Sequence, residues 1–238
     1  MIVKIIFILI ILACSIVPNF FIKKTILNIN SKSDLSILFL SDLHTRISKY
    51  NATKILKAAD EVDIVLLGGD TLDRKFNGSS VINMLYSIEK PIYYVLGNHE
   101  VGRDDLIEKL DEIAKRLKYV ELKDLAIYGV DDPLYDTAWT VPIVKDKNKY
   151  NILVSHRPEY LDKYKDYDLA LTGHAHGGQV RLPIIGGLFA PHQGFFPKYT
   201  KGMYKNTFVS TGATTKIQLI VPRIFNRPEY VIINLKNS

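Results

Sequence analysis

Short apolar runs and amphipathic stretches take turns along most of the chain. The apolar runs are typical of buried strands and fall at residues 36–40, 63–67, 92–96, 125–130, 151–155, 168–172, 207–210 and 230–234. The amphipathic stretches predict helices at residues 49–59, 79–88, 104–117 and 158–164. Because strand and helix alternate, we expect an α/β fold in which helices cover a largely parallel sheet.

Polar residues follow the first three predicted strands at equal spacing. Asp42, Asp70 and Asn98 are separated by 28 residues in each case (70 − 42 and 98 − 70). Right-handed βαβ crossovers bring successive strand ends to one edge of a sheet, which is where α/β proteins build their sites. We therefore expect these three residues to meet at one edge.

The first 24 residues differ from the rest of the chain. Residues 5–22 carry no charge, and this stretch of 18 residues is just long enough for a helix to cross the ~30 Å hydrocarbon layer of a bilayer. We predict a transmembrane or signal helix within residues 1–24, a linker at 25–34 and one domain at 35–238. A cleaved signal peptide and lipidation at Cys14 are alternatives. A single anchor would place the protein at the cell membrane, and the flanking lysines do not decide on which side.

Composition and charge narrow the class of protein further. With 47% hydrophobic and 24% charged residues, the chain suits one globular domain, and its single cysteine excludes an internal disulfide. The whole net charge of +6 falls in residues 181–229, which hold seven basic residues and one acidic residue. Such a positive field attracts phosphate-bearing substrates or an anionic membrane surface, although a solvated face without a partner is the alternative.

Five of the six histidines stand in short polar motifs at the ends of predicted strands. The motifs are Ser41-Asp42-Leu43-His44, Gly68-Gly69-Asp70, Gly97-Asn98-His99-Glu100, Ser155-His156-Arg157-Pro158 and Gly173-His174-Ala175-His176. Two of them hold pairs spaced two residues apart, and the period of a strand points both members of a pair the same way. Their carboxylate, amide and imidazole groups suit manganese, iron or zinc. Together, the five motifs predict a metal site.

The order of these motifs, D-x-H, G-G-D, G-N-H-E, H and G-H-x-H, resembles the calcineurin-like metallophosphoesterase superfamily from about Leu35 to the carboxyl end. The resemblance implies a mixed α/β (α+β) fold, a four-layer α/β/β/α sandwich. It also implies two divalent metal ions, for which we expect manganese, with iron or zinc as alternatives. The matching ligand residues are Asp42, His44 and His176 for the first metal, Asn98, His156 and His174 for the second, and Asp70 as the bridge.

For function, the resemblance implies hydrolysis of a phosphoester or pyrophosphate bond. Two divalent cations share a water whose pKa falls toward ~7, and the bridging hydroxide attacks phosphorus directly. His99 is not needed as a ligand, so we expect it to act as the catalytic acid or hydrogen-bond donor toward the leaving oxygen. A purely structural role for His99 is the alternative.

A finer resemblance concerns the membrane-anchored bacterial branch of this superfamily, which includes UDP-2,3-diacylglucosamine pyrophosphatase-type enzymes. It rests on His156-Arg157-Pro158-Glu159, on residues 173–183 and on a late Pro228-Glu229. The chain carries Lys216-Ile217-Gln218-Leu219 where that branch has an Ile-Arg-Phe-like run. This departure leaves the metal chemistry unchanged, but the substrate of that branch does not follow for this chain.

Basic and apolar residues are interleaved between residues 181 and 205. We expect Arg181, Phe195 and Phe196 to bind a phosphate-containing substrate, which can be lipid-linked, or to meet the membrane surface. An ordinary packed loop is the alternative. His192, in the same segment, is expected to be a surface or packing residue.

Two other functions stay open. A nuclease or cyclic-nucleotide phosphodiesterase would use the same metals, but the chain lacks a recognisable aromatic and basic stacking platform, so we expect no nucleic-acid partner. A catalytically silent metal-binding scaffold for protein partners would have little reason to keep every ligand type. The sequence makes no prediction of the oligomeric state.

Overall fold

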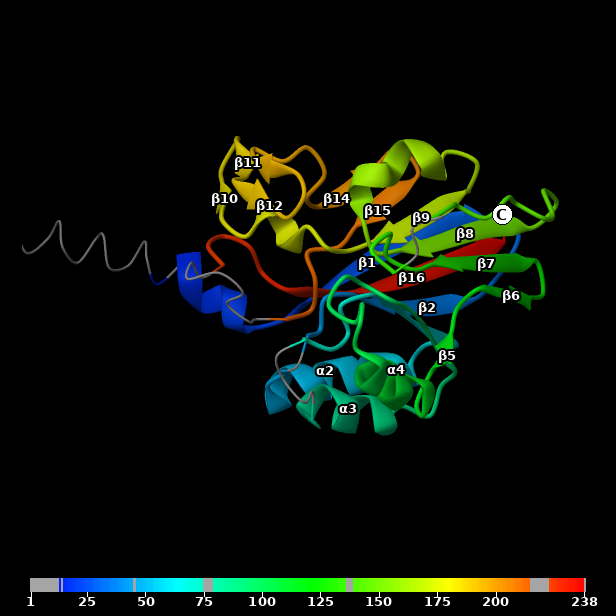
Figure 1. The fold of residues 1–238 in the computed structure, drawn as a ribbon, viewed down its shortest axis with the longest axis horizontal. Coiled ribbons are helices and arrows are strands. Elements are labelled where there is room, and N and C mark those ends of the chain that lie inside the picture. The colour runs from blue at the N-terminus through cyan, green and yellow to red at the C-terminus, as the bar shows by residue number, and fades with distance from the viewer. Residues whose placement is uncertain are drawn as a thin grey trace, which may run out of the picture.

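The computed structural model describes residues 13, 15–44, 46–74, 79–135, 139–214 and 223–237. Two six-stranded sheets pack face to face at the centre of the domain (Figure 1). The first sheet has the order β1 (Lys23–Ser31), β16 (Glu229–Asn237), β2 (Ser36–Leu40), β3 (Ile64–Gly68), β4 (Ile92–Val95) and β5 (Lys115–Arg116). Strands β2 to β5 are parallel to one another, whereas β16 runs antiparallel to β2.

The second sheet has the order β14 (Gly202–Tyr204), β15 (Thr207–Val209), β9 (Leu169–Thr172), β8 (Tyr150–Ser155), β7 (Leu125–Val130) and β6 (Tyr119–Leu122). Its four central strands are parallel, and both edge strands are antiparallel to their neighbours. Two short hairpins follow β9, namely β10 (Arg181–Leu182) with β11 (Gly186–Gly187) and β12 (Phe189–Ala190) with β13 (Gly194–Phe195). Most strands are thus parallel, as expected, but they are divided between two sheets.

Alternate residues of the central strands separate the layers. On β2, Phe39 belongs to the apolar layer between the sheets, whereas Leu38 packs toward the helices. Helices α2 (Lys49–Asp60), α3 (Ser79–Tyr86) and α4 (Asp104–Asp111) cover the outer face of the first sheet (Figure 1). The 3-10 helix η2 (Pro158–Tyr164), kinked at Tyr160, and residues around Trp139 cover the second sheet. The fourth layer of the expected α/β/β/α sandwich is therefore a short 3-10 helix and loop instead of an α-helix.

Two elements differ from the expectations in their extent. The helix expected at 104–117 ends at Asp111, because residues 115–117 turn to pair with β4, where the Leu117 amide donates to the Tyr94 carbonyl at 2.7 Å. The linker expected at 25–34 is largely strand β1, which pairs with β16 over nine residues.

The amino-terminal residues pack on the domain as far as they are described. The helix η1 (Val17–Phe20) is a four-residue 3-10 helix, Ile22 is fully buried, and Asn19 donates to the carbonyl of Arg223 at 2.9 Å. Among the described residues, no helix is both long and apolar enough to cross a membrane. Within the expected membrane segment, Ser15, Asn19 and Ile22 are buried, whereas Val17, Phe20 and Phe21 are exposed. Residues 1–12 and Cys14, in the rest of the expected anchor, lie outside the described residues.

Candidate metal centre

The loops that follow β2, β3 and β4 meet at one edge of the first sheet. The amide of Asp42 donates to the carbonyl of Gly69 at 3.0 Å, and the amide of His44 donates to the carbonyl of Asp70 at 2.9 Å. The amide of His99 donates to Asp70 Oδ1, also at 2.9 Å. The predicted meeting of these strand ends is confirmed, and the loop backbones themselves hold it.

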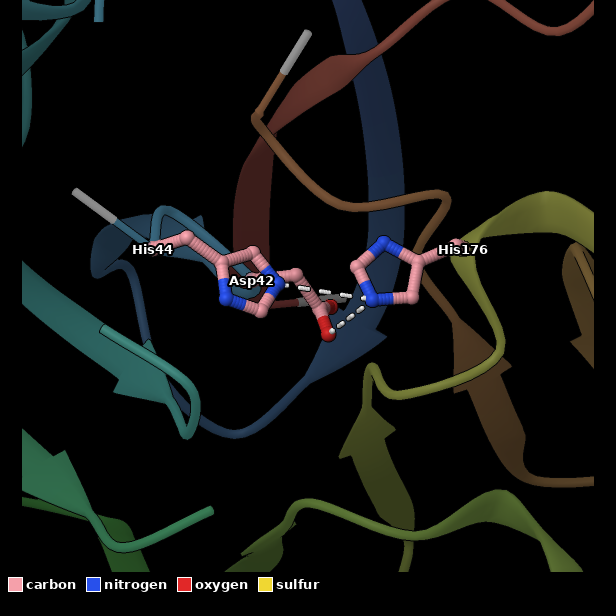
Figure 2. Close-up of side chains that lie close together, drawn as sticks. All are labelled: Asp42, His44 and His176. Atoms are coloured by element: carbon pink, nitrogen blue, oxygen red, sulfur yellow. Dashed lines mark hydrogen bonds and ion pairs between the residues drawn. The ribbon is translucent and has the colours of Figure 1, made fainter. Parts of the chain in front are cut away.

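Asp42, His44 and His176 form a first cluster of buried ligand groups (Figure 2). His176 Nε2 lies 3.5 Å from Asp42 Oδ1 and 3.5 Å from His44 Nε2. Asp42 and His44 come from the loop after β2, whereas His176 begins the short 3-10 helix η3 (His176–Gly178) after β9. The cluster thus joins the two sheets and offers one oxygen and two nitrogens to a metal ion.

A second cluster lies in the same loops and consists of Asp70, His156 and His174. His156 Nε2 lies 3.3 Å from Asp70 Oδ2 and 3.1 Å from His174 Nδ1. The carbonyl oxygen of Gly68 lies 2.8 Å from His156 Nδ1 and can accept its hydrogen, which turns Nε2 toward the other two residues. This cluster also presents one carboxylate and two imidazoles.

Asn98 and His99 complete the residues that the motifs single out. Asn98 Oδ1 is buried and has no hydrogen-bond partner among the described residues, which is the state expected of an oxygen reserved for a metal ion. His99 Nε2 lies 3.8 Å from Asp70 Oδ2, and its ring meets that of His44 edge-on at 4.8 Å. His99 therefore stands between the first and second clusters.

Most of the clustered residues have a strained backbone. Asp42, His44, Asp70, His174 and His176 all have φ between 46° and 64°, the left-handed region that residues other than glycine rarely adopt. Such a conformation costs about 1–3 kcal/mol per residue and is typical of functional sites. It also corrects the argument from strand periodicity, because these residues lie in turns beyond the strand ends. His174 and His176 accordingly belong to different clusters.

The surroundings of the cluster histidines shift their pKa values in different directions. Burial keeps the pKa of His174 and His176 well below 6.5, so both imidazoles are neutral at pH 7 and have a lone pair for a metal ion. Burial also opposes the charged forms of His156 and Asp70, but their mutual attraction outweighs it. The pKa of His156 rises to about 10, and that of Asp70 falls well below 3.8.

Sequence reasoning missed two acidic residues around the clusters. Asp73 lies 3.6 Å from His99 Nδ1 and 3.8 Å from His44 Nδ1. Glu100 accepts the buried amides of Asp70, Leu72 and Gly97 at 2.8–3.2 Å and so joins the loops after β3 and β4. Glu100 stands inside a motif and Asp73 three residues after one, but neither position predicted the partners, which are set by how the loops fold.

His192 was expected at the surface, and the structure places it against a candidate ligand. Its side chain is exposed, yet His192 Nδ1 lies 2.9 Å from His174 Nε2. The guanidinium of Arg181 instead donates to the carbonyl of Gly177 at 2.8 Å and to Thr200 Oγ1 at 3.0 Å, so it links β10 to the segments on either side of the hairpins. Phe195 and Phe196 are exposed on the second hairpin. None of the last three residues belongs to the clusters.

A buried ion pair supports the loop that carries His156. Arg157 Nε lies 2.6 Å from Asp132 Oδ2, and Arg157 Nη2 lies 3.0 Å from Asp132 Oδ1. Asp132 follows β7 and Arg157 follows β8, so this two-pronged contact ties neighbouring strand ends together.

Comparison with known proteins agrees with this geometry. The family model for calcineurin-like phosphoesterases matches residues 35–178. Among curated proteins, YpbG of Bacillus subtilis is 30% identical over 86% of this chain and 82% of its own length. The metallophosphoesterase YkoQ of the same species is 30% identical over 64% of this chain and 65% of its own length. The phosphodiesterase YaeI of Escherichia coli is 26% identical over 87% of this chain and 84% of its own length. With a family match over more than half of its length and these ligand groups in place, the chain belongs to the calcineurin-like phosphoesterase family.

Proposed function

We propose that this protein hydrolyses phosphoester bonds with two divalent metal ions held at the first and second clusters. The observation that carries the proposal is that two adjacent ligand groups are built from buried residues, five of which keep a left-handed backbone. A fold has no packing reason to concentrate this strain at five of six acidic and imidazole residues.

Each cluster would hold one ion, with Asn98 added to the second and Asp70 shared between them. When bound, the ions supply Lewis-acid polarisation of the phosphate and activate a water as the nucleophile. We propose manganese as the ion, with iron or zinc as alternatives, for this set of carboxylate, amide and imidazole donors. The chain's own contribution is to keep neutral imidazoles ready, since burial holds the pKa of His174 and His176 low.

We assign His99 to the leaving oxygen. It is partly exposed, unlike the clustered residues, and its backbone amide is fixed to Asp70 Oδ1. Asp73 faces Nδ1 at 3.6 Å and so can orient the ring. The proton on Nε2 can then be donated as the P–O bond breaks.

For the substrate, we propose a phosphodiester or a pyrophosphate, with a lipid-linked one as the finer form. A relative named as a phosphodiesterase supports the diester. Phe195 and Phe196 support a lipid-linked substrate, because they are exposed on the hairpin whose loop carries His192 to His174. The UDP-2,3-diacylglucosamine pyrophosphatase-type reaction is one form of this proposal.

The test measures hydrolysis of p-nitrophenyl phosphate and of bis-p-nitrophenyl phosphate by the full chain with added manganese. We expect turnover of at least one ester, lost together with the metal in Asp70→Ala. In His99→Ala we expect turnover to fall about 10²–10⁴-fold while metal content stays near normal. Protein that carries two metals by elemental analysis and turns over neither ester would support the silent scaffold instead.

A second measurement addresses the substrate. Lipid-linked pyrophosphates, nucleotide pyrophosphates and single-stranded nucleic acid are compared at equal concentration. Preferred cleavage of nucleic acid would favour a nuclease over the proposed hydrolase of lipid-linked or nucleotide pyrophosphates. Equal loss of metal in His99→Ala and Asp70→Ala would show that His99 is a ligand.

A further inference from the structure

Among the described residues, large exposed apolar side chains gather at one end of the molecule. Ile184 is fully exposed, Phe195 and Phe196 are 78% and 70% exposed, and Phe20 and Phe225 are about half exposed. Together with Ile185, these residues are called the apolar end below. Figure 1 shows β10, β11 and β12 at the same end of the domain as the amino-terminal helix, which is drawn in blue.

Hydrogen bonds join the segments of the apolar end into one unit. The amide of Phe225 donates to the carbonyl of Ser15 at 3.0 Å, and the amide of Arg181 donates to the carbonyl of Ile224 at 2.9 Å. The amide of Phe196 donates to the carbonyl of Leu188 at 2.9 Å. The apolar side chains are therefore carried on a connected framework, and a partner would meet them together.

The tip of the first hairpin shows that this exposure is built in. Ile184 lies between β10 and β11 with φ of 71°, a left-handed conformation that is strongly unfavourable for a β-branched residue. Turns in water normally use glycine, asparagine or aspartate at such positions. Isoleucine held outward in this way is suited to an apolar phase.

Charge and chain direction favour a lipid bilayer as that phase. Among the described basic residues of 181–229, Lys198, Lys205 and Arg227 are exposed and Arg223 is buried. The one acidic residue of this range, Glu229, is buried and paired with Lys23 at 3.0 Å. Residues 1–12 contain one charged side chain among apolar ones, and they join the described chain next to Ser15, whose carbonyl holds Phe225. Apolar tips beside lysines match the acyl and headgroup layers of an anionic membrane.

We propose that the apolar end docks on an anionic lipid bilayer, with Ile184, Ile185, Phe195 and Phe196 inserted below the headgroups. The loop between β12 and β13 carries His192 to within 2.9 Å of His174, so docking would bring the metal centre close to the membrane surface. The proposal concerns the surface itself and stands whether or not the centre hydrolyses a phosphoester.

The test uses the full chain with its single cysteine replaced (Cys14→Ser) and an environment-sensitive NBD dye on one new cysteine. The dye is placed by Ile184→Cys or Phe195→Cys, and in a matched control by Ile143→Cys. Ile143 is 88% exposed and lies in the segment beside Trp139, away from the apolar end. Residues 1–12 are common to all three proteins, so their own membrane binding cannot create a difference among them.

With vesicles of phosphatidylcholine and phosphatidylglycerol, we expect NBD emission at positions 184 and 195 to rise several-fold and to be quenched by spin-labelled lipid. Position 143 should stay unchanged, and pure phosphatidylcholine should give a weaker response. Adding Ile184→Ser and Ile185→Ser to the protein labelled at 195 should reduce the quenching several-fold, whereas adding Ile143→Ser should not.

Two outcomes would overturn the proposal. One is an equal response of positions 143, 184 and 195 to vesicles. The other is a rise at 184 and 195 that needs only higher protein concentration and no lipid, because a second copy of the chain would then cover this surface.

Discussion

Replacing Asp132 with alanine should destabilise the protein strongly. Arg157 is 4% exposed, and both of its short contacts go to the fully buried Asp132. Asp132→Ala leaves this guanidinium buried without its main partner and also removes the acceptor of the Leu134 amide, bonded at 2.9 Å. Breaking a buried ion pair from one side costs about 3–5 kcal/mol. For a chain of this size, that corresponds to a fall in Tm of roughly 6–20 °C.

The assay is urea unfolding followed by circular dichroism, with a chelator present so that lost metal binding does not contribute. The matched control is Glu121→Gln, which breaks the exposed bridge to Lys149 and should change the free energy of unfolding by about 0.5 kcal/mol or less. The double variant Asp132→Ala/Arg157→Met removes the stranded charge and should be more stable than Asp132→Ala alone. If Asp132→Ala unfolds at the same urea concentration as Glu121→Gln, or if the double variant is the least stable, the reasoning fails.

Three further predictions concern the metal centre. Because the Asp70 and Asp42 carboxylates outweigh burial and raise the pKa of His156 to about 10, metal-free His156 is protonated at pH 7 and must lose its proton to bind an ion. Manganese affinity should therefore rise about tenfold per pH unit between pH 7 and 9, with proton release visible by calorimetry in two buffers, and a flat profile would contradict this. His192→Ala should weaken metal binding about 10–100-fold, because His174 loses its neighbour at Nε2, and unchanged affinity would show that the contact is incidental. Manganese at a thousand times its Kd should stabilise the metal-free protein by about 4 kcal/mol in thermal unfolding. No rise in Tm would mean that manganese does not bind the folded form.

The sequence was most informative where neighbouring residues alone decide the structure. Continuous apolar runs marked β2, β3 and β7 because these strands are buried on both faces. The residues of the two clusters were found because their motifs follow such strands directly. Each of these features can be read within about ten residues of the chain.

What the sequence did not predict depends on distant partners. Along β1 the burial of the side chains alternates, but its sequence KKTILNINS does not alternate regularly between polar and apolar residues. Its pairing with β16 makes it a strand. The left-handed backbone of Asp42 and His44 is imposed by carbonyl groups of the loop after β3. The contact between His192 and His174 depends on the fold of a hairpin that no local sequence pattern predicts.

The pairing of β1 with β16 also has a consequence for biosynthesis. Lys23 and Glu229 are partners in register although 206 residues separate them (229 − 23). At ribosomal rates of about 5–20 residues per second, β1 waits roughly 10–40 s for its neighbour. Because β16 also separates β1 from β2, the first sheet cannot close before residues 229–237 have been synthesised, and a nonsense codon at Glu229 would leave β1 permanently without its neighbour.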